Sequence, residues 1–236
     1  MVEAVLLAGG RGTRLAPYTT VLPKPLMPVG EMPVLEILLR RLAAQEIVTV
    51  HLAVGHLAEL IEAYFGDGSR WGIELRYWRE SEPLGTAGPL AAIELGSERV
   101  LVMNGDLLTT LDFRALLDAH VAAGSDATIA IRRREVPVDF GVVRTDSTHV
   151  VGFEEKPVLS YDVSMGVYVF ERGLLDRIPR GQRYDFPDLL ERLLADGCRV
   201  GAYRSEDFWL DIGRHDDYER ANQEFDALRA ELLGER

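Results

Sequence analysis

The feature that most constrains the fold is a short apolar run near the N-terminus that leads directly into a glycine-rich turn. Residues 4–8, Ala-Val-Leu-Leu-Ala, have the length and composition of a buried strand, and glycines follow at positions 9, 10 and 12. Glycines let backbone N–H groups crowd around a small anion, as they do where a strand passes into a phosphate-binding loop. We therefore predict that this loop binds a phosphate chain.

The charges around the loop support this interpretation. No acidic residue occurs between Glu3 and Glu31, whereas Arg11, Arg14 and Lys24 are basic, in a chain with a formal net charge of −12. A local positive region in an acidic protein is typical of a phosphate site. The overall negative charge argues against a nucleic-acid backbone or an anionic membrane as a partner.

Two familiar glycine loops fit this segment poorly. A dinucleotide-binding loop needs G-x-G-x-x-G, but Leu15 stands at the third glycine position, and a P-loop needs G-K-[ST], where this chain has Thr13-Arg14. A glycine turn without a ligand would account for the glycines but not for the acid-free basic segment. A Rossmann oxidoreductase and a P-loop NTPase are therefore disfavoured.

The rest of the chain alternates between helical and strand patterns. Leucines at 35, 38, 39 and 42 repeat at helical spacing, which predicts a helix with one buried face. We predict strands over 4–8, 47–54, 73–78, 100–103, 127–131, 141–144, 150–154, 163–170 and 199–203, and helices over 33–45, 57–65, 86–95, 112–121, 186–195 and 216–233, with Thr86 near the N-cap of the third helix. This order indicates an α/β fold with a mixed, mostly parallel central sheet covered on both faces, and ligands at the carboxyl ends of its strands.

Length and composition indicate one domain over residues 1–236. No Pro/Gly/Ser-rich linker interrupts the chain, so we expect a single domain rather than two. The N-terminus shows neither a signal peptide nor a membrane span, which leads us to expect a cytoplasmic protein.

A series of motifs in a fixed order resembles one known family. Leu7-Ala-Gly-Gly-Arg-Gly-Thr-Arg-Leu-Ala-Pro, followed by Pro23-Lys-Pro-Leu, is similar to the signature of the sugar-1-phosphate nucleotidyltransferases, also called NDP-sugar pyrophosphorylases. Further matching segments begin at Glu82, Asn104, Phe140, Phe153, Ser164 and Trp209, so the resemblance covers almost the whole chain.

The resemblance implies a Rossmann-like three-layer sandwich, the nucleotide-diphospho-sugar transferase fold. Within the single domain it implies a nucleotide-binding half over about 1–125 and a sugar-binding half over about 126–236. It also implies transfer of a nucleotidyl group from an NTP to a sugar 1-phosphate, with release of pyrophosphate. No hexapeptide repeat follows the last motif, so we expect no C-terminal β-helix domain. Homodimers are common in the family, and a homodimer is possible here, although no segment of this sequence requires one.

The same resemblance assigns roles to individual residues. Arg14 would bind the β- and γ-phosphates, Lys24 would reach the α-phosphate, and Lys156 would bind the phosphate of the sugar. The nucleotide-binding residues would be Leu7, Ala8, Gly9, Gly10, Arg11, Gly12, Thr13, Glu80, Pro83, Gly85 and Thr86. The sugar-binding residues would be Asn104, Gly141, Glu155, Ser164, Gly166 and Trp209.

Two aspartates suggest a magnesium site. Asp106 follows the apolar strand over 100–103, and Asp211 follows Trp209-Leu210, which we expect at a neighbouring strand end. Hard carboxylate oxygens together with phosphate oxygens suit Mg²⁺. The alternatives are a type I′ hairpin turn at Asn104-Gly105 and a turn or cap at Asp211. The flanking motifs favour the metal.

Glu80 bears on the choice of base. It lies three residues before Pro83, where thymidylyl- and uridylyltransferases of the family tend to have glutamine. A carboxylate only accepts hydrogen bonds, which suits the N1–H and N2–H₂ donors of guanine, and the segment is similar to guanylyltransferases acting on mannose or heptose 1-phosphate. We predict GTP. The alternatives are a solvated Glu80, or a uridylyl- or thymidylyltransferase acting on a glucose- or N-acetylmuramate-type 1-phosphate.

The predicted sugar site departs from the family motif at one position. Ser164 stands where much of the family has asparagine, so the sugar site differs from the usual one.

Two other classes of protein fit the sequence less well. A glycosyltransferase would ordinarily show Asp-x-Asp at a strand end, which is absent. A nucleotide-sensing homologue without activity would be free to lose the candidate phosphate and metal ligands. All four, Arg14, Lys24, Asp106 and Asp211, are present, which favours an enzyme.

Overall fold

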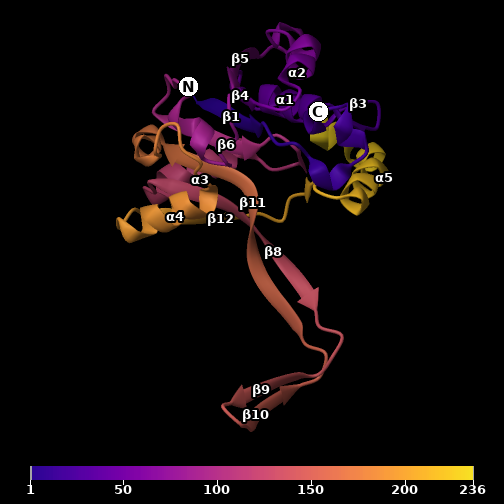
Figure 1. Cartoon of the computed structure of the whole chain (residues 1–236), viewed down its shortest axis with the longest axis vertical. Coiled ribbons are helices and arrows are strands. Elements are labelled where there is room, and N and C mark those ends of the chain that lie inside the picture. The colour runs from indigo at the N-terminus through magenta and orange to yellow at the C-terminus, as the bar shows by residue number, and fades with distance from the viewer. Residues whose placement is uncertain (1, 236) are drawn as a thin grey trace.

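A computed structural model describes residues 2–235, which form a seven-stranded sheet with helices on both faces (Figure 1). The strands are arranged in the order β12–β8–β11–β6–β1–β4–β5. Their bounds are β1 Glu3–Ala8, β4 Thr49–Val54, β5 Glu74–Arg79, β6 Arg99–Asn104, β8 Ala127–Pro137, β11 Val158–Glu171 and β12 Val200–Arg204. β1 is parallel to β4 and β6, whereas β11 is antiparallel to β6 and β8. The predicted mixed, mostly parallel sheet is confirmed.

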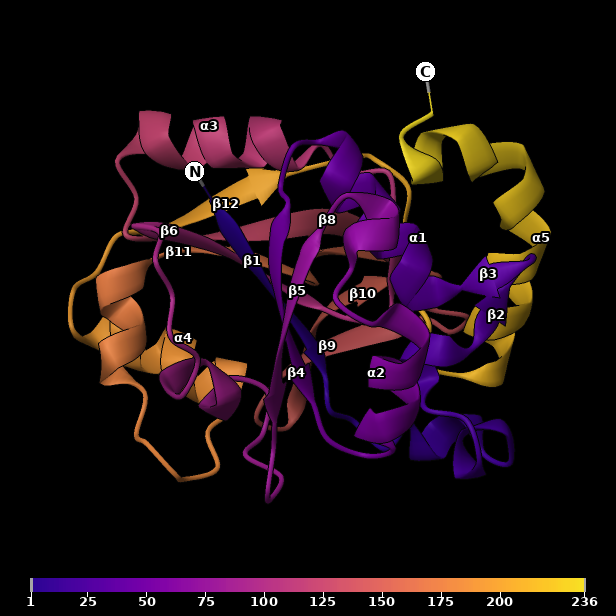
Figure 2. The same cartoon turned by 90° about the horizontal axis from the view of Figure 1, so that it is seen from above.

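The alternation of side chains along β1 explains the three layers. Ala4 and Leu6 join one buried cluster with leucines of α1, whereas Val5 joins a second cluster with Leu189 of α4. The helices are α1 Val34–Ala44, α2 Ala58–Phe65, α3 Phe113–Ala123, α4 Phe186–Ala195 and α5 His215–Leu233. Figure 2 shows α3 and α4 on opposite sides of the sheet. No helix within residues 2–235 combines the length and the apolar character needed to cross a membrane.

Several short strands and 3-10 turns lie outside the seven-stranded sheet. Three two-stranded ribbons pair β2 (Pro28–Val29) with β3 (Met32–Pro33), β7 (Leu107–Thr109) with β13 (Trp209–Asp211), and β9 (Val142–Asp146) with β10 (His149–Glu154). Single 3-10 turns cover Thr13–Leu15, Tyr18–Thr20, Lys24–Leu26, Ser69–Trp71, Gly88–Ala91 and Arg172–Arg177.

The helix predicted over 86–95 is wrong. The structure has only the 3-10 turn Gly88–Ala91 there, because the N–H groups of Ala87 and Gly88 both donate to the carbonyl of Tyr184 at 2.9 Å. A side chain at Gly88 would collide with Leu84, and glycine and proline are poor helix formers. Contacts with a segment about one hundred residues away therefore override the local periodicity.

The second half of the sheet carries an extension that the sequence did not predict. β8 and β11 run beyond the predicted 127–131 and 163–170, and their outer parts leave the body as a two-stranded ribbon with the β9–β10 hairpin at its end (Figure 1). We call residues 132–163 the arm. The run Arg132-Arg133-Arg134-Glu135 lacks the apolar alternation that would mark a strand, which is why the extension was not predicted.

The C-terminal helix α5 supplies the first test. The ring of Phe225 is 2 % exposed and lies against Gly30, whose φ of +60° and lack of a Cβ leave room for it. We expect Phe225→Ala to lower the free energy of unfolding by about 3–5 kcal/mol through lost burial and a cavity. Chemical denaturation measures this loss. Phe225→Leu should cost well under half as much, and a loss for Phe225→Ala no larger than that of the exposed Leu194→Ala would contradict the packing.

Candidate functional site

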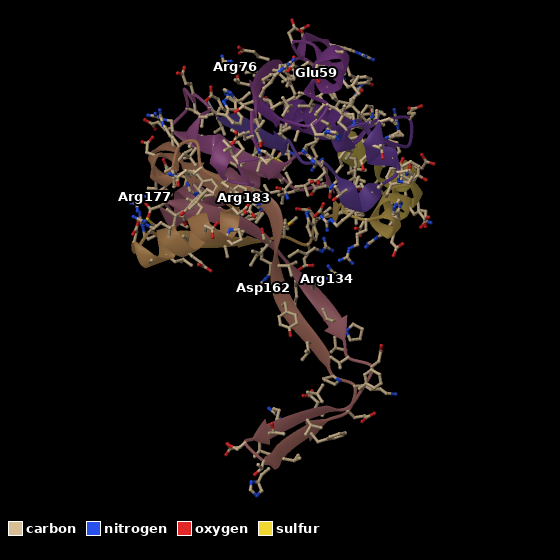
Figure 3. All side chains as sticks on the ribbon, in the orientation of Figure 1. Glu59, Arg76, Arg134, Asp162, Arg177 and Arg183 are labelled. Atoms are coloured by element: carbon tan, nitrogen blue, oxygen red, sulfur yellow. The ribbon has the colours of Figure 1, made fainter. Side chains whose placement is uncertain are left out.

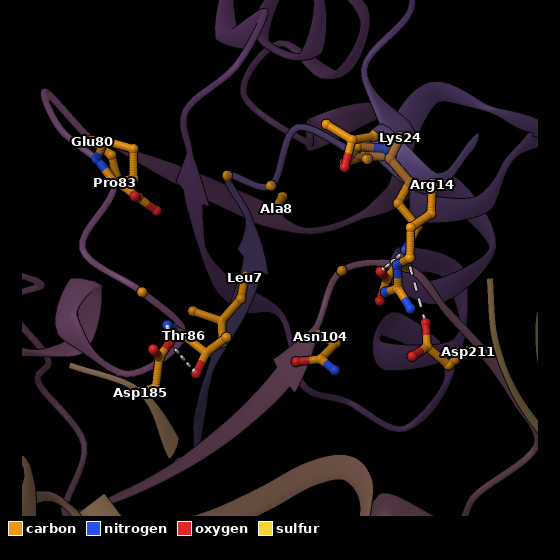
Figure 4. Close-up of a pocket in the computed structure, with 18 of the residues that line it drawn as sticks. Leu7, Ala8, Arg14, Lys24, Glu80, Pro83, Thr86, Asn104, Asp185 and Asp211 are labelled. Atoms are coloured by element: carbon orange, nitrogen blue, oxygen red, sulfur yellow. Dashed lines mark hydrogen bonds and ion pairs between the residues drawn. The ribbon is translucent and has the colours of Figure 1, made fainter. Parts of the chain in front are cut away.

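A cavity of about 470 Å³ opens at the carboxyl ends of β1 and β6 (Figure 4). The predicted residues that line it are Leu7, Ala8, Gly9, Gly10, Gly12, Thr13, Arg14, Lys24, Glu80, Pro83, Gly85, Thr86, Asn104, Asp106 and Asp211. Pro25, Gly105, Arg183 and Asp185 line it as well. Figure 4 shows Glu80 and Pro83 at one end, and Lys24, Arg14 and Asp211 at the other. The structure thus brings most of the predicted residues into one cavity of ligand size.

The glycine-rich loop is held open by its own backbone geometry. Gly12 has a φ of +61°, and a Cβ there would lie 2.9 Å from the side chain of Thr19, whose hydroxyl donates to the Gly12 carbonyl at 2.8 Å. Among the described residues, the N–H groups of Gly10, Arg11 and Gly12 have no protein acceptor. These donors are therefore free for an anion in the cavity.

A lysine and two aspartates form the charged centre of the cavity. Lys24, in the turn after Pro23, donates to the Oδ2 of Asp106 and has its Nζ 3.8 Å from the Oδ1 of Asp211. β13 pairs with β7 so that Asp211 lies opposite Leu107, and the Ile212 N–H donates to the Asp106 carbonyl at 3.2 Å. The two carboxylates therefore lie close together, as predicted, but β13 pairs with β7 and not with β6, the strand that Asp106 follows.

Asn104-Gly105 does not form the alternative hairpin. β7 pairs with β13 rather than with β6. The Gly105 N–H instead donates to the Leu7 carbonyl at 2.9 Å, and a Cβ at this position would lie 3.0 Å from the same oxygen. Glycine is required here because the turn packs directly on β1, and this contact places Asp106 at the cavity.

The carboxylate pair has spare ligand capacity. The Oδ1 atoms of Asp106 and Asp211 are both buried and accept no hydrogen bond in the part of the chain that the structure describes. Buried oxygens without partners are costly, and a hard cation would satisfy them. No group of three or more His, Cys, Asp or Glu side chains suited to a metal occurs within residues 2–235. A cation bound by this pair would need further oxygens from its substrates or from water.

The electrostatics of Asp211 reflect this arrangement. Burial, and then repulsion by Asp106, raise the pKa of Asp211 above its ordinary value, although Lys24 and Arg14 oppose the shift. The guanidinium of Arg14 lies beside Gly213, 3.5 Å from the position that a Cβ would take on that glycine. It forms no ion pair with any residue in 2–235. Arg14 is therefore available to an anion from outside the chain.

Glu80 is a half-buried acceptor rather than a fully solvated surface charge. It follows β5, receives the Leu84 N–H at 3.3 Å, and approaches Gly9 so closely that a Cβ at Gly9 would lie 2.5 Å from its Oε1. Burial raises the pKa of Glu80, and the Leu84 hydrogen bond opposes the shift only in part. A ligand with N–H donors would stabilise the ionised carboxylate.

Sequence reasoning missed Arg183 and Asp185. Asp185 accepts the Thr86 N–H at 2.8 Å and the Thr86 hydroxyl at 3.2 Å, while the Thr86 oxygen accepts the Phe186 N–H at 2.9 Å. The Thr86 N–H holds the pKa of Asp185 below its usual range. Asp185 also caps α4, and its spacing of three residues from Asp188 was a usable signal. Thr86 therefore anchors its loop to α4 instead of beginning a helix.

Three predicted sugar-binding residues lie behind Asn104. Gly166 has a φ of +69°, and a Cβ there would lie 2.5 Å from the Asn104 Nδ2. The Ser164 hydroxyl donates to the Tyr168 hydroxyl at 3.1 Å and accepts the Gly166 N–H at 3.2 Å. Trp209 donates from Nε1 to the Met165 carbonyl at 2.7 Å. This network fixes the wall that carries the Asn104 amide.

Ser164, Gly166 and Trp209 do not themselves line the cavity, and four further predicted residues do not either. Arg11 faces a smaller neighbouring cavity together with His56. Gly141, Glu155 and Lys156 lie on the arm, and the side chains of Glu155 and Lys156 are exposed. A Cβ at Gly141 would meet the ring of Phe153 and the Glu155 carboxylate, so these residues contact one another and not the cavity. The roles expected of the four in nucleotide or sugar binding stay predictions.

Comparisons with known proteins agree with the geometry. The family model described as "Nucleotidyl transferase" matches residues 3–227. The chain is 40% identical to the mannose-1-phosphate guanylyltransferase of Mycobacterium tuberculosis over 94% of its length, but spans only 64% of that relative. It is 36% identical to the UTP–glucose-1-phosphate uridylyltransferase of Synechocystis, with coverages of 93% and 62%.

Two further similarities extend over whole relatives. The D-glycero-alpha-D-manno-heptose 1-phosphate guanylyltransferase of Aneurinibacillus thermoaerophilus is 33% identical, with 94% of this chain and 98% of the relative covered. The crystal structure of HddC from Yersinia pseudotuberculosis complexed with GMP-PN superposes with a TM-score of 0.75 at 25% identity, covering 95% of this chain and 100% of that one.

The raised pKa of Asp211 predicts that its charge destabilises the chain without ligands. We expect Asp211→Asn to raise Tm at pH 7, measured by calorimetry without divalent cations. Because the folded pKa is raised, the wild-type chain recovers this stability as the pH falls through that pKa, so the gain should shrink at lower pH. Asp118→Asn, at an exposed position of α3, is the control. A gain that is absent, or that grows on acidification, would contradict this account.

Proposed function

Because the chain belongs to the nucleotidyl transferase family, whose model matches residues 3–227, we propose that it transfers a nucleotidyl group from an NTP to a sugar 1-phosphate. The products are an NDP-sugar and pyrophosphate. The observation that carries the proposal is that one cavity unites unpaired loop N–H groups, Lys24 and two carboxylates with spare oxygens.

The proposed reaction is an in-line displacement at the α-phosphorus. An oxygen of the sugar phosphate forms the new bond while the bond to pyrophosphate breaks, so the protein has to orient two anions and neutralise the leaving group. Lys24 is the cation for the α-phosphate, and Arg14, which has no carboxylate partner among the described residues, is the cation for the β- and γ-phosphates. The free N–H groups of the loop hold the triphosphate in line.

The charge of the cavity lining argues for a divalent cation. Its three basic side chains are Arg14, Lys24 and Arg183, and its four acidic ones are Glu80, Asp106, Asp185 and Asp211. Such a lining does not attract a triphosphate by itself. We propose that Asp106 and Asp211 hold Mg²⁺ through their unpartnered Oδ1 atoms. When bound, Mg²⁺ would supply positive charge to the phosphate oxygens.

Glu80 supports guanine as the base. It lies at the end of the cavity opposite Lys24 and has a half-buried carboxylate that accepts only the Leu84 N–H. The N1–H and N2–H₂ groups of guanine are the donors that such an acceptor needs. The relatives from M. tuberculosis and A. thermoaerophilus are guanylyltransferases by name, which agrees with this choice.

For the acceptor, we propose a mannose- or heptose-type 1-phosphate. Asn104 packs against Gly166 and presents its amide to the cavity. Ser164 stands where much of the family has the larger asparagine. The names of the same two relatives include these sugars.

The direct test is pyrophosphate release with Mg²⁺ for GTP, UTP, dTTP, CTP and ATP, each with a panel of hexose and heptose 1-phosphates. We expect turnover with GTP and loss of at least about a hundredfold in Asp106→Asn, since the variant loses one cation ligand. Binding of nucleotide without turnover for any pair would contradict the enzyme assignment and favour a nucleotide-sensing role.

Glu80 can be tested separately from the activity. Glu80→Gln replaces an acceptor-only group by one that also donates, so the ratio of kcat/KM for GTP over UTP should fall by roughly tenfold or more. Glu82→Gln, exposed on the same loop, should leave the ratio unchanged. An unchanged ratio in Glu80→Gln would exclude Glu80 as the residue that selects the base.

A uridylyltransferase is the second candidate function. The 36% identity to the Synechocystis enzyme favours it. Turnover by the wild-type chain with UTP or dTTP and not with GTP would establish this alternative and keep the class of reaction.

A further inference from the structure

Within residues 2–235, the arm stands away from the sheet and from the helices that pack on it (Figure 1). Its strands pair with each other over six positions, from Arg132 opposite Val163 to Pro137 opposite Val158, beyond the last contacts with β12 and β6. The β9–β10 hairpin pairs with no other strand among residues 2–235. At about 3.3 Å per residue the ribbon alone extends about 20 Å from the sheet. Figure 3 shows side chains standing free along it beyond Arg134 and Asp162.

The arm also concentrates the exposed apolar surface. Nine of the sixteen large apolar side chains that are exposed in the described part of the chain lie between positions 136 and 161. They are Val136, Phe140, Val143, Val150, Val151, Phe153, Val158, Leu159 and Tyr161. Phe140 is 78% and Phe153 63% exposed. A two-stranded ribbon is marginal in water, and an apolar patch of this kind marks an interaction surface.

The charges of the arm and of the cleft at its root indicate which surface covers the arm. The end of the arm carries four acidic side chains, Asp139, Asp146, Glu154 and Glu155, against two basic ones, Arg144 and Lys156. A cleft at the root of the arm is lined by six arginines, Arg14, Arg132, Arg133, Arg134, Arg214 and Arg220, against Asp211 and Asp217. This cleft shares Arg14 and Asp211 with the candidate active site. An acidic apolar tip and an arginine-lined cleft on the same chain are complementary between two copies.

We propose that two copies of this chain exchange their arms, so that the arm of each lies over the arginine-lined cleft of the other. The exchange brings Lys156 and Glu155 of one copy to the cavity of its partner, where Lys156 completes the site for the phosphate of the sugar. This deepens the proposed function and rests on it. The contact is isologous, so it closes as a dimer with two equivalent sites.

The geometry within one chain favours exchange over closure of the arm on its own body. β8 and β11 continue without a break from the sheet into the ribbon, and their antiparallel pairing holds the arm pointing away from the body (Figure 1). The register is irregular only between Ser164 and Tyr168, inside the sheet. Lys156, at the far end of this ribbon, does not line the cavity of its own chain, so only the arm of a second copy is left to bring such a lysine there.

Complementation between two inactive variants tests the exchange. Lys156→Ala keeps an intact cavity, and Asp106→Asn keeps an intact arm. A heterodimer isolated through two different affinity tags has one site with both parts intact, so it should turn over at about half the wild-type rate while each parent is nearly inactive. A heterodimer as inactive as its parents would show that the arm serves its own chain and would overturn the proposal, as would failure to recover any heterodimer.

The contact itself is tested without relying on turnover. Sedimentation velocity should give a dimer for the wild-type chain and a monomer for Phe140→Ser/Phe153→Ser. Val121→Ser/Leu194→Ser, which changes exposed apolar side chains on α3 and α4, should remain dimeric. A wild-type monomer, or a double arm variant that stays dimeric, would overturn the exchange. If the wild-type dimer turns over no substrate pair, the proposed function fails while this result still decides the contact.

Discussion

The ion pair between Lys24 and Asp106 is the interaction on which the rest of the site depends. Asp106 lies in the turn after β6 and Asp211 lies in β13, and burial, followed by repulsion between the two carboxylates, raises the pKa of Asp211. Lys24 offsets this repulsion by contacting both carboxylates from a separate turn. A divalent cation would take over that role and leave the ammonium group free for a phosphate, so the same three residues account for both the ligand-free arrangement and the proposed chemistry.

Close backbone contacts place these charges. Gly105 packs against the carbonyl of Leu7, Gly9 leaves room for the Glu80 carboxylate, and Gly12 takes a positive φ beside Thr19. A side chain as small as alanine at any of these positions would force the neighbouring group to shift. The cavity is therefore built by β1 and the backbones packed on it. Glu80 after β5, Asp106 after β6 and Asp211 in β13 present their carboxylates to this common space.

The sequence predicted the body of the fold and most of the cavity because both depend on local signals. The continuous apolar run of β1 and the leucines of α1 predicted the sheet and its covering helix, and the motifs around Gly9 and Asp106 predicted the ligand loop and the carboxylates. Asp185 was missed because its contact with Thr86 joins segments 99 residues apart. The strands predicted over 141–144 and 150–154 are confirmed as β9 and β10 of the arm. The ribbon that carries them was missed for a related reason, since a ribbon that packs on nothing within its own chain needs no apolar periodicity of its own.

The measurement that tests the central claim most directly is calorimetric titration of GTP into wild-type, Asp106→Asn and Lys24→Ala chains, with and without Mg²⁺. The account predicts that Mg²⁺ strengthens GTP binding to the wild-type chain by at least about tenfold, that Asp106→Asn loses this enhancement, and that Lys24→Ala keeps the enhancement but binds more weakly. Equal affinity with and without Mg²⁺ in the wild-type chain would contradict the assignment of Asp106 and Asp211 to a cation.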